Sequence, residues 1–301
     1  MMIAPATGYL TPTPPFDFAK SLEFLKLLPP LQNQQAVAVQ SLTKAVFVGG
    51  QLIGFQLQSK GTVKQPKLEY TLFAEQPITQ PIQDAALDRI AFFLSLEDDL
   101  QPFYRLGQTD LNFAPLIDQL YGYHQVKFLT PFEAACWAVL TQRTPFSTAH
   151  EIKQALVENL GGFLSQDGRS YAAFPEPEKI AALSQHDLAG LVRNQRKAGY
   201  LSAIAAAFCQ VDEKFLRTEA KSKVETWLRQ IKGIGAWSAA FILLRGLGRT
   251  ESVPLSERRL IEAIAQVYPQ SQTMSNTALA RLAARYGPWQ GYWAHYLRVA
   301  T

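Results

Sequence analysis

The first 80 or so residues alternate hydrophobic and polar positions in short runs separated by turn residues. A period of two is typical of half-buried β-strands, because successive side chains point to opposite faces. Strands are predicted at residues 36–40, 44–48, 51–58 and 68–74. One amphipathic helix is predicted before them, at residues 17–28, where Pro29-Pro30 ends the pattern. Residues 1–83 are therefore predicted to form a small α+β domain with an antiparallel sheet.

After a Gln- and Pro-rich stretch at residues 74–84, the hydrophobic positions follow the period of a helix. One helix begins at Thr130-Pro131-Phe132-Glu133, where Thr130 is the expected N-cap, Pro131 takes the first helical position and Glu133 completes a capping box. Further helices are predicted at residues 147–160, 177–183, 187–192, 195–208, 221–231, 236–247, 256–268, 275–286 and 289–299. The pattern predicts an all-α region over residues 84–301.

Composition limits the partners and the kinds of site that the chain can have. The 29 Lys and Arg against 25 Asp and Glu give a net charge of +4, which suits a nucleic-acid partner but is also common in proteins that bind none. Basic residues gather at 193–197 and 217–232, where a solvated helix face is the alternative interpretation. Apolar runs fall far short of the ~20 residues that span a bilayer, so no membrane partner is predicted. Cys136 and Cys209 lie apart in apolar helical patterns, and neither a disulfide nor a metal site is expected.

The sequence Gly233-Ile234-Gly235 joins the two helices predicted at 221–231 and 236–247. So short a turn makes a helical hairpin, and its glycines permit positive φ and a close approach of another molecule to the backbone. The amide groups at the start of the second helix would point outward at its positive dipole end, which suits a phosphate. A helix C-cap followed by a tight turn explains the same residues without a ligand.

An acidic residue, Glu257, follows the second hairpin glycine by 22 residues (257 minus 235). This separation is long enough for one helix and a loop back, so a carboxylate could face DNA held by the hairpin. The alternative is that Ser256 caps a helix and Glu257 is an acid of its first turn, favoured there by the helix dipole. Spacing alone does not choose between the two interpretations.

Several motifs occur in one order along the chain: "FFLSLEDDLQPFY", "TPFEAACWAVLTQ", "NQRKAGYLSAIA", "GIGAWSA" with "LRGLG" and Pro254-x-x-Glu257, and "YGPWQGYWAHYL". This set resembles the helix-hairpin-helix-Gly-Pro-Asp (HhH-GPD) superfamily of DNA glycosylases, in its 3-methyladenine DNA glycosylase II branch. The N-terminal segment is also similar to the accessory domain of that branch. The resemblance therefore covers nearly the whole chain and implies an α+β domain followed by an all-α helix-hairpin-helix glycosylase region, with the hairpin at 221–247.

The resemblance implies a chemistry for Glu257. Glycosylases of this kind flip a damaged base out of the duplex and cut its N-glycosidic bond, and the family's catalytic Asp stabilises the cationic sugar. Glu257 stands at the position of this Asp, and its extra methylene could displace the carboxylate by about 1 Å. A displacement of that size can lower the rate of catalysis ~100-fold. Relatives that also nick the strand carry a lysine where this chain has Trp237, so a monofunctional enzyme is predicted.

The resemblance also implies binding residues. Trp237 and Phe241 match aromatic positions that border the base pocket in the family, where stacking and cation-π attraction would hold an alkylated base. Trp289 could add to that pocket, and core packing is the alternative for Phe241 and Trp289. The DNA contacts implied are Lys232, Gly233, Ile234, Gly235, Ala236 and, in the wedge region that fills the gap left by the flipped base, Gln142 and Arg143. No cofactor is implied, and a monovalent cation held by hairpin carbonyls is left open.

Two hypotheses of different class follow. The first is a monofunctional glycosylase that acts in base excision repair, as a monomer, on double-stranded DNA containing a damaged base. The second is a non-catalytic or weakly active damaged-DNA-binding protein in which Glu257 has replaced the catalytic Asp. The N terminus lacks the charged start of a secretory signal, so the expected location is the bacterial cytoplasm or, in a eukaryote, the nucleus.

Overall fold

The computed structural model describes residues 5–27, 35–251, 253, 255, 257–270 and 275–301. Its N-terminal part is a five-stranded antiparallel sheet with the strand order β1-β5-β4-β3-β2. The strands are β1 (Ala6–Leu10), β2 (Gln35–Val37), β3 (Ser41–Val48), β4 (Gln51–Ser59) and β5 (Leu68–Phe73). Gly49 and Gly50, with φ of 57° and 76°, form the two-residue turn between β3 and β4 that the twist of a hairpin favours.

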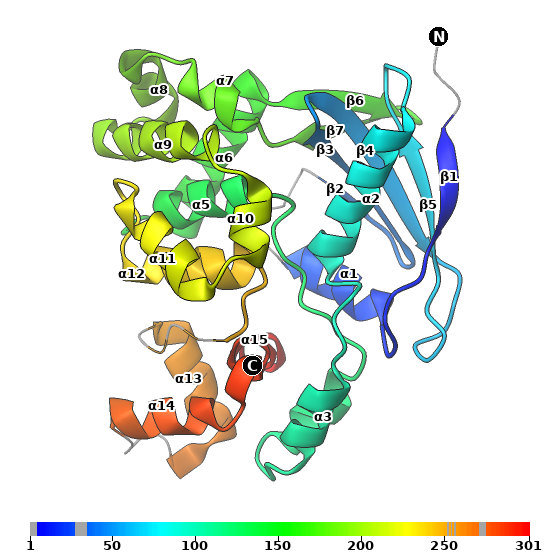
Figure 1. Ribbon diagram of the computed structural model, residues 1–301, viewed down its shortest axis with the longest axis vertical. Helices are drawn as coiled ribbons and strands as arrows, with labels where there is room; N and C mark the ends of the chain where they lie inside the picture. The colour runs from blue at the N-terminus through cyan, green and yellow to red at the C-terminus, as the bar shows by residue number, and fades with distance from the viewer. Residues whose placement is uncertain (1–4, 28–34, 252, 254, 256, 271–274) are drawn as a thin grey trace.

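The alternation along β3 divides the sheet into two buried faces. Val46 and Val48 pack into the larger core with α1 (Phe18–Leu27) and α2 (Gln80–Leu94), and Figure 1 shows α2 in front of the sheet. Ala45 and Phe47 belong to a smaller cluster on the other face. The strands predicted at 44–48, 51–58 and 68–74 are confirmed, because a period of two fixes which side chains are buried. Of the strand predicted at 36–40, only residues 36 and 37 lie in a strand, the short β2. Pro29-Pro30, the expected end of the first helix, lies outside the described residues.

The smaller cluster is completed by a second hairpin, β6 (Gly162–Gln166) and β7 (Arg169–Ala173). The sequence prediction missed this hairpin, although its turn carries a clear signal. Asp167 and Gly168 both have positive φ, 50° and 73°, and Asp-Gly is favoured in such two-residue turns. The helical region is thus interrupted by two strands that cover the N-terminal sheet. β1 was also not predicted.

The rest of the described chain is helical, as predicted. The remaining helices are α3 (Gln101–Gln108), α4 (Ala114–Gln119), α5 (Pro131–Leu140), α6 (Phe146–Leu160), α7 (Pro177–Ala181), α8 (Gln185–Val192), α9 (Gln195–Phe208), α10 (Glu213–Thr218), α11 (Lys221–Gln230), α12 (Ala236–Phe241), α13 (Arg258–Val267), α14 (Asn276–Ala284) and α15 (Gln290–Ala300). Thr130 caps α5 by accepting from the Glu133 amide (3.1 Å). The Glu133 carboxylate instead forms an ion pair with Lys153 (2.8 Å), so only half of the predicted capping box is present.

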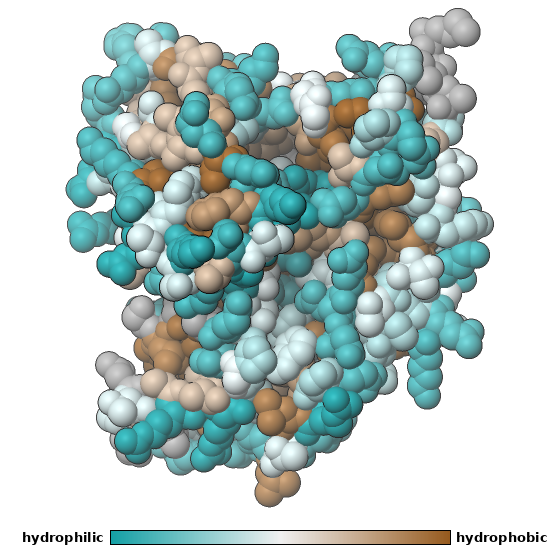
Figure 2. Space-filling view, in the orientation of Figure 1, coloured by the Kyte–Doolittle hydropathy of each residue, from teal (hydrophilic) through white to brown (hydrophobic). Residues whose placement is uncertain are grey.

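Two hydrophobic cores organise the molecule. The first joins one face of the sheet to α2, α3, α4 and the C-terminal helices α13, α14 and α15. The second joins helices α5 to α12. Figure 1 shows α13 and α14 set apart from the upper helices, and Figure 2 shows hydrophilic residues along much of the outer edge of this face. The predicted boundary at residue 83 lies inside α2, whose buried side chains belong to the first core. None of the described helices is both long and apolar enough to span a bilayer.

Candidate DNA-binding hairpin and base cavity

The α11–α12 connection forms the predicted hairpin. Gly233 has φ of +98°, and a Cβ there would lie 2.4 Å from Cγ of Tyr200, so conformation and space both require glycine. Ile234 is buried and anchors the turn, while Gly235 and Ala236 are exposed. Helix α11 ends at Gln230, so Gly233 is not the glycine of a simple C-cap. The hairpin therefore presents its backbone at the start of α12 to the outside.

The loop that follows α5 is tied to this hairpin. Gln142 Nε2 donates to the Gly233 carbonyl (2.8 Å) and to Ser238 Oγ (2.9 Å). Lys197 Nζ donates to the Leu140 carbonyl and the Thr144 hydroxyl from the other side. Between these attachments Arg143 is exposed and has a positive φ of 50°. Of the two residues predicted in the wedge region, Gln142 braces the loop and Arg143 projects from it.

Loop and hairpin together border a hollow of about 860 Å³. Its basic side chains are Arg143, Arg196, Lys197, Arg229 and Lys232. The hollow includes all five predicted hairpin residues from Lys232 to Ala236. The backbone and the cationic side chains thus face the same space, as a phosphate-binding surface requires.

A second cavity, of about 460 Å³, opens next to this hollow, and Trp237 lines both. The Trp237 and Phe241 rings are stacked, with centroids 5.5 Å apart and planes at 25°. Both side chains are only partly buried. The two predicted pocket residues on α12 are therefore brought together on a cavity wall, and Phe128 meets Phe241 edge-on from the second core (5.9 Å).

Glu257 reaches the same cavity. It is the N-cap residue of α13, and its side chain makes no capping hydrogen bond. Its Oε2 instead accepts from Arg298 Nη1 at 2.6 Å, with about a fifth of each side chain exposed. Pro254 and Ser256, which belong to the same motif, lie outside the described residues.

The back of the cavity is formed by a buried chain of polar groups. Residues Ile242–Gly246 continue α12 as a π-helix, a departure from α-geometry often found at functional sites, and Arg245 lies within it. Arg245 Nη1 donates to His295 Nδ1 (3.1 Å), so His295 Nε2 carries the proton and donates to the Tyr123 hydroxyl (2.9 Å). Burial, more than the nearby Arg298 charge, lowers the pKa of Arg245 to about 10. Site prediction missed Arg245, His295 and Arg298; a lone arginine inside an apolar run was the available signal for the first.

The structure places Trp289 elsewhere, which corrects its assignment to the base pocket. Its ring packs against Phe103 (6.1 Å) and Tyr292 (5.8 Å) and lines a separate surface hollow with Pro102 and Arg105. Aromatic residues at helical spacing predict burial, but they do not say which of two cores receives them.

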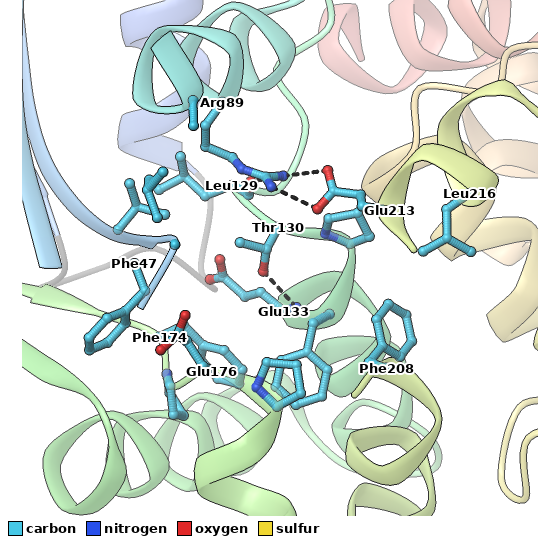
Figure 3. Close-up of a pocket in the computed structure, with 18 of the residues that line it drawn as sticks. Phe47, Arg89, Leu129, Thr130, Glu133, Phe174, Glu176, Phe208, Glu213 and Leu216 are labelled. Atoms are coloured by element: carbon cyan, nitrogen blue, oxygen red, sulfur yellow. Dashed lines mark hydrogen bonds and ion pairs between the residues drawn. The ribbon is translucent and has the colours of Figure 1, made fainter. Parts of the chain in front are cut away.

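A further cavity of about 330 Å³ separates the sheet from α5 and α10 (Figure 3). Figure 3 shows Arg89 turned toward Glu213, and its two terminal nitrogens, Nη1 and Nη2, donate to the Glu213 carboxylate (2.8 and 2.7 Å). Arg89 and Arg217 hold the pKa of Glu213 below its ordinary value despite burial, which acts in the opposite direction. These bonds fix the junction of the two cores. Among the described residues, no three His, Cys, Asp or Glu side chains gather as a metal site would require.

The chain is similar to known proteins in sequence and in structure. The family model described as "HhH-GPD superfamily base excision DNA repair protein" matches residues 136–290, just over half of the chain. A DNA-3-methyladenine glycosylase of Bacillus subtilis is 28% identical over 225 residues, 74% of either chain. A 3-methyladenine DNA glycosylase from Archaeoglobus fulgidus superposes with a TM-score of 0.82 at 18% identity, over 97% of both chains. An 8-oxoguanine glycosylase/lyase of Clostridium acetobutylicum, solved with double-stranded DNA, gives 0.72 at 13% identity, over 100% of this chain and 97% of that one.

Proposed function

Because the chain belongs to the HhH-GPD superfamily of base excision DNA repair proteins, we propose that it is a monofunctional DNA glycosylase for alkylated bases of the 3-methyladenine type. The observation that carries this proposal is the position of Glu257, whose carboxylate lines an aromatic cavity that adjoins the hairpin. The name of the Bacillus subtilis relative, DNA-3-methyladenine glycosylase, supports the class of base.

Duplex DNA is the partner that the hairpin surface fits. Phosphates would accept hydrogen bonds from the exposed amides at Gly235 and Ala236, with Lys232 supplying a charge beside them. The projecting Arg143 would enter the gap left by a flipped base, while Gln142 keeps its loop in place. A protein of the same fold solved with double-stranded DNA supports this partner.

The flipped base would enter the cavity past Trp237, the residue shared with the hairpin surface. Damaged bases are easier to extract because their pairing or stacking is already weakened. Stacking on Trp237 and Phe241 would then hold the base plane, with the sugar toward Glu257. This order puts the scissile bond near the carboxylate.

Glu257 would act on the sugar as the bond breaks. Positive charge develops at C1′ when the electron pair of the C1′–N bond moves to the base, and a fixed carboxylate stabilises that charge. Arg298 holds Oε2 at 2.6 Å, which restricts the longer Glu side chain to one position. Trp237 offers no amine for a Schiff base, so water is the only nucleophile and the strand stays intact. We expect neither a cofactor nor a second subunit to take part.

Base release from duplexes with a single alkylated adenine tests the proposal. The wild type is expected to release the base, and Glu257→Gln to lose at least 100-fold in single-turnover rate while binding the same duplex. Glu158→Gln, an exposed acid on α6, is the matched control and should keep full activity. Strand cleavage and borohydride trapping should both be absent.

Two results would overturn excision. Tight, salt-sensitive binding by the wild type without release would favour the damaged-DNA-binding alternative. Absence of binding even at low salt would eliminate both.

A further inference from the structure

Helix α9 supports both parts of the surface that would face DNA. Lys197 and Tyr200 are three residues apart on α9, so their side chains lie on the same face of the helix. Lys197 bonds to the loop that follows α5. Tyr200 packs against the hairpin, where a Cβ on Gly233 would lie 2.4 Å from its ring. The hairpin and the loop that carries Arg143 therefore rest on one helix.

The Lys197 ammonium lies at the end of α5. Lys197 is 8% exposed, and its Nζ donates to the carbonyl of Leu140, the last residue of α5, and to the Thr144 hydroxyl. A cation is favoured at this place because the last carbonyls of a helix lack intrahelical partners and carry the negative end of its dipole. One ammonium thus joins the two ends of the loop formed by residues 141–144.

The Thr144 hydroxyl extends this contact to the hairpin. It accepts from Lys197 and donates to the Gln142 carbonyl at 3.0 Å. The Gln142 side chain in turn donates from Nε2 to the Gly233 carbonyl (2.8 Å) and to Ser238 Oγ (2.9 Å). Hydrogen bonds therefore connect α9 to the loop and the loop to the hairpin.

Arg143 lies inside this set of bonds in an unfavourable backbone conformation. Its φ of +50° is in the left-handed region, which a Cβ disfavours, and its side chain is exposed. Such a conformation persists only where the surrounding structure holds it. The bonds made by Lys197, Thr144 and Gln142 hold the loop on both sides of Arg143, so they fix the direction in which Arg143 projects.

We propose that Lys197, acting through the Thr144 hydroxyl, is a positioning residue for base flipping, which holds the loop so that Arg143 enters the duplex when the hairpin binds its phosphates. The inference rests on the proposed function and assigns residues to one step of it. Loss of the Thr144 bonds should leave the phosphate contacts of the hairpin intact. It should weaken the filling of the gap that a flipped base leaves, so the flipped state becomes less populated and base release becomes slower.

Thr144→Val and Thr144→Ser are a matched pair, because Val keeps the shape without the hydroxyl and Ser keeps the hydroxyl. Flipping is followed by stopped flow with 2-aminopurine placed next to a single alkylated adenine, since its fluorescence rises when its neighbour leaves the stack. Thr144→Val should diminish this rise and slow single-turnover base release about tenfold, as expected for a hydrogen bond to a charged group. Thr144→Ser should behave as the wild type.

Affinity for undamaged duplex separates positioning from general binding. In fluorescence anisotropy the Kd of Thr144→Val should change by less than about twofold, because phosphate contacts supply that affinity. Lys197→Met keeps the length of the side chain without its ammonium, and it should show the same loss of flipping and release as Thr144→Val. Lys179→Met, an exposed lysine on α7, is the control and should change none of these values.

The outcomes distinguish failure of this inference from failure of the proposed function. A wild-type fluorescence rise and release rate in Thr144→Val overturns the positioning role while excision stands. An equal defect in Thr144→Ser, or an equal loss of affinity for undamaged duplex, also overturns it, because the hydroxyl would then not act on flipping. A wild type that shows the fluorescence rise, lost in Thr144→Val, but releases no base overturns the proposed function and leaves the positioning role in place.

Discussion

Lys44 on β3 is a buried cation whose removal should stabilise the protein in a pH-dependent way. Its residue exposure is 2%, and its charged neighbours are Glu133 and Lys153, which already form an ion pair with each other at 2.8 Å. Two lysines therefore share one carboxylate. Burial lowers the pKa of Lys44 from 10.5 to about 7, with the Glu133 charge opposing the shift and the Lys153 charge adding to it.

The magnitude follows from the difference between the two pKa values of Lys44. From 10.5 to about 7 is about 3.5 units, and at about 1.4 kcal/mol per unit the buried charge costs about 5 kcal/mol below pH 7. The unfolded chain keeps the proton up to pH 10.5, whereas the folded protein has released it by then. Stability should therefore rise with pH between these values. At pH 9 the remaining cost is about 2 kcal/mol, since only about 1.5 units separate that pH from the unfolded value.

Substitution Lys44→Met keeps the volume and removes the charge. The free energy of unfolding should increase by a few kcal/mol at pH 7, roughly twice the increase at pH 9. Urea unfolding followed by tryptophan fluorescence at both pH values measures this, with the exposed Lys64→Met as the control. A Lys44→Met variant less stable than wild type at pH 7 would refute the reasoning, because it would mean that a charged Lys44 contributes favourably through Glu133.

Three further changes have defined outcomes. Gly233→Ala should weaken binding to undamaged duplex at least tenfold in fluorescence anisotropy, because φ of +98° and the 2.4 Å approach to Tyr200 force the hairpin to move; unchanged affinity would contradict the role of this turn. Glu257→Asp should slow base release by ~100-fold in single-turnover assays, since the carboxylate retreats by about 1 Å from Arg298; a faster variant would mean that Glu is a handicap. Gly168→Ala should cost about 1 to 2 kcal/mol in unfolding free energy from positive φ alone, because open space surrounds that position; a neutral result would show that the turn adapts.

The parts of the fold that the sequence predicted are those set by local periodicity. Alternation fixes β3 and β4, and the N-cap Thr130 marks the start of α5. The β6–β7 hairpin was missed because its strands are short and their hydrophobic and polar residues alternate only weakly. The Asp167-Gly168 turn is the sequence feature that indicates it. The sequence did not predict which core each helix joins. Helices α13 to α15 belong to the same core as the N-terminal sheet, although the two are far apart in the sequence.

The same distinction holds for the site. The hairpin, Trp237 and Glu257 were predicted because a contiguous motif carries them. Arg298 lies 41 residues after Glu257 and meets it only through the packing of α15 against α13. Trp289 was misassigned for the same reason, because its helical spacing gave no information about the direction of the neighbouring core.

Elements of both hydrophobic cores form the base cavity, and this determines how the carboxylate of Glu257, at the family's Asp position, is held. Trp237 and Phe241 belong to the second core, whereas α13 and α15 pack in the first. The position of the Glu257 carboxylate is fixed by Arg298 on α15 and not by capping of its own helix. The Glu257 side chain, one methylene longer than Asp, can therefore hold one position because Arg298 binds its carboxylate at the cavity wall. Base excision by this chain therefore depends on both residues of the pair. A Glu at residue 257 can replace the Asp only where an arginine at residue 298 holds its carboxylate.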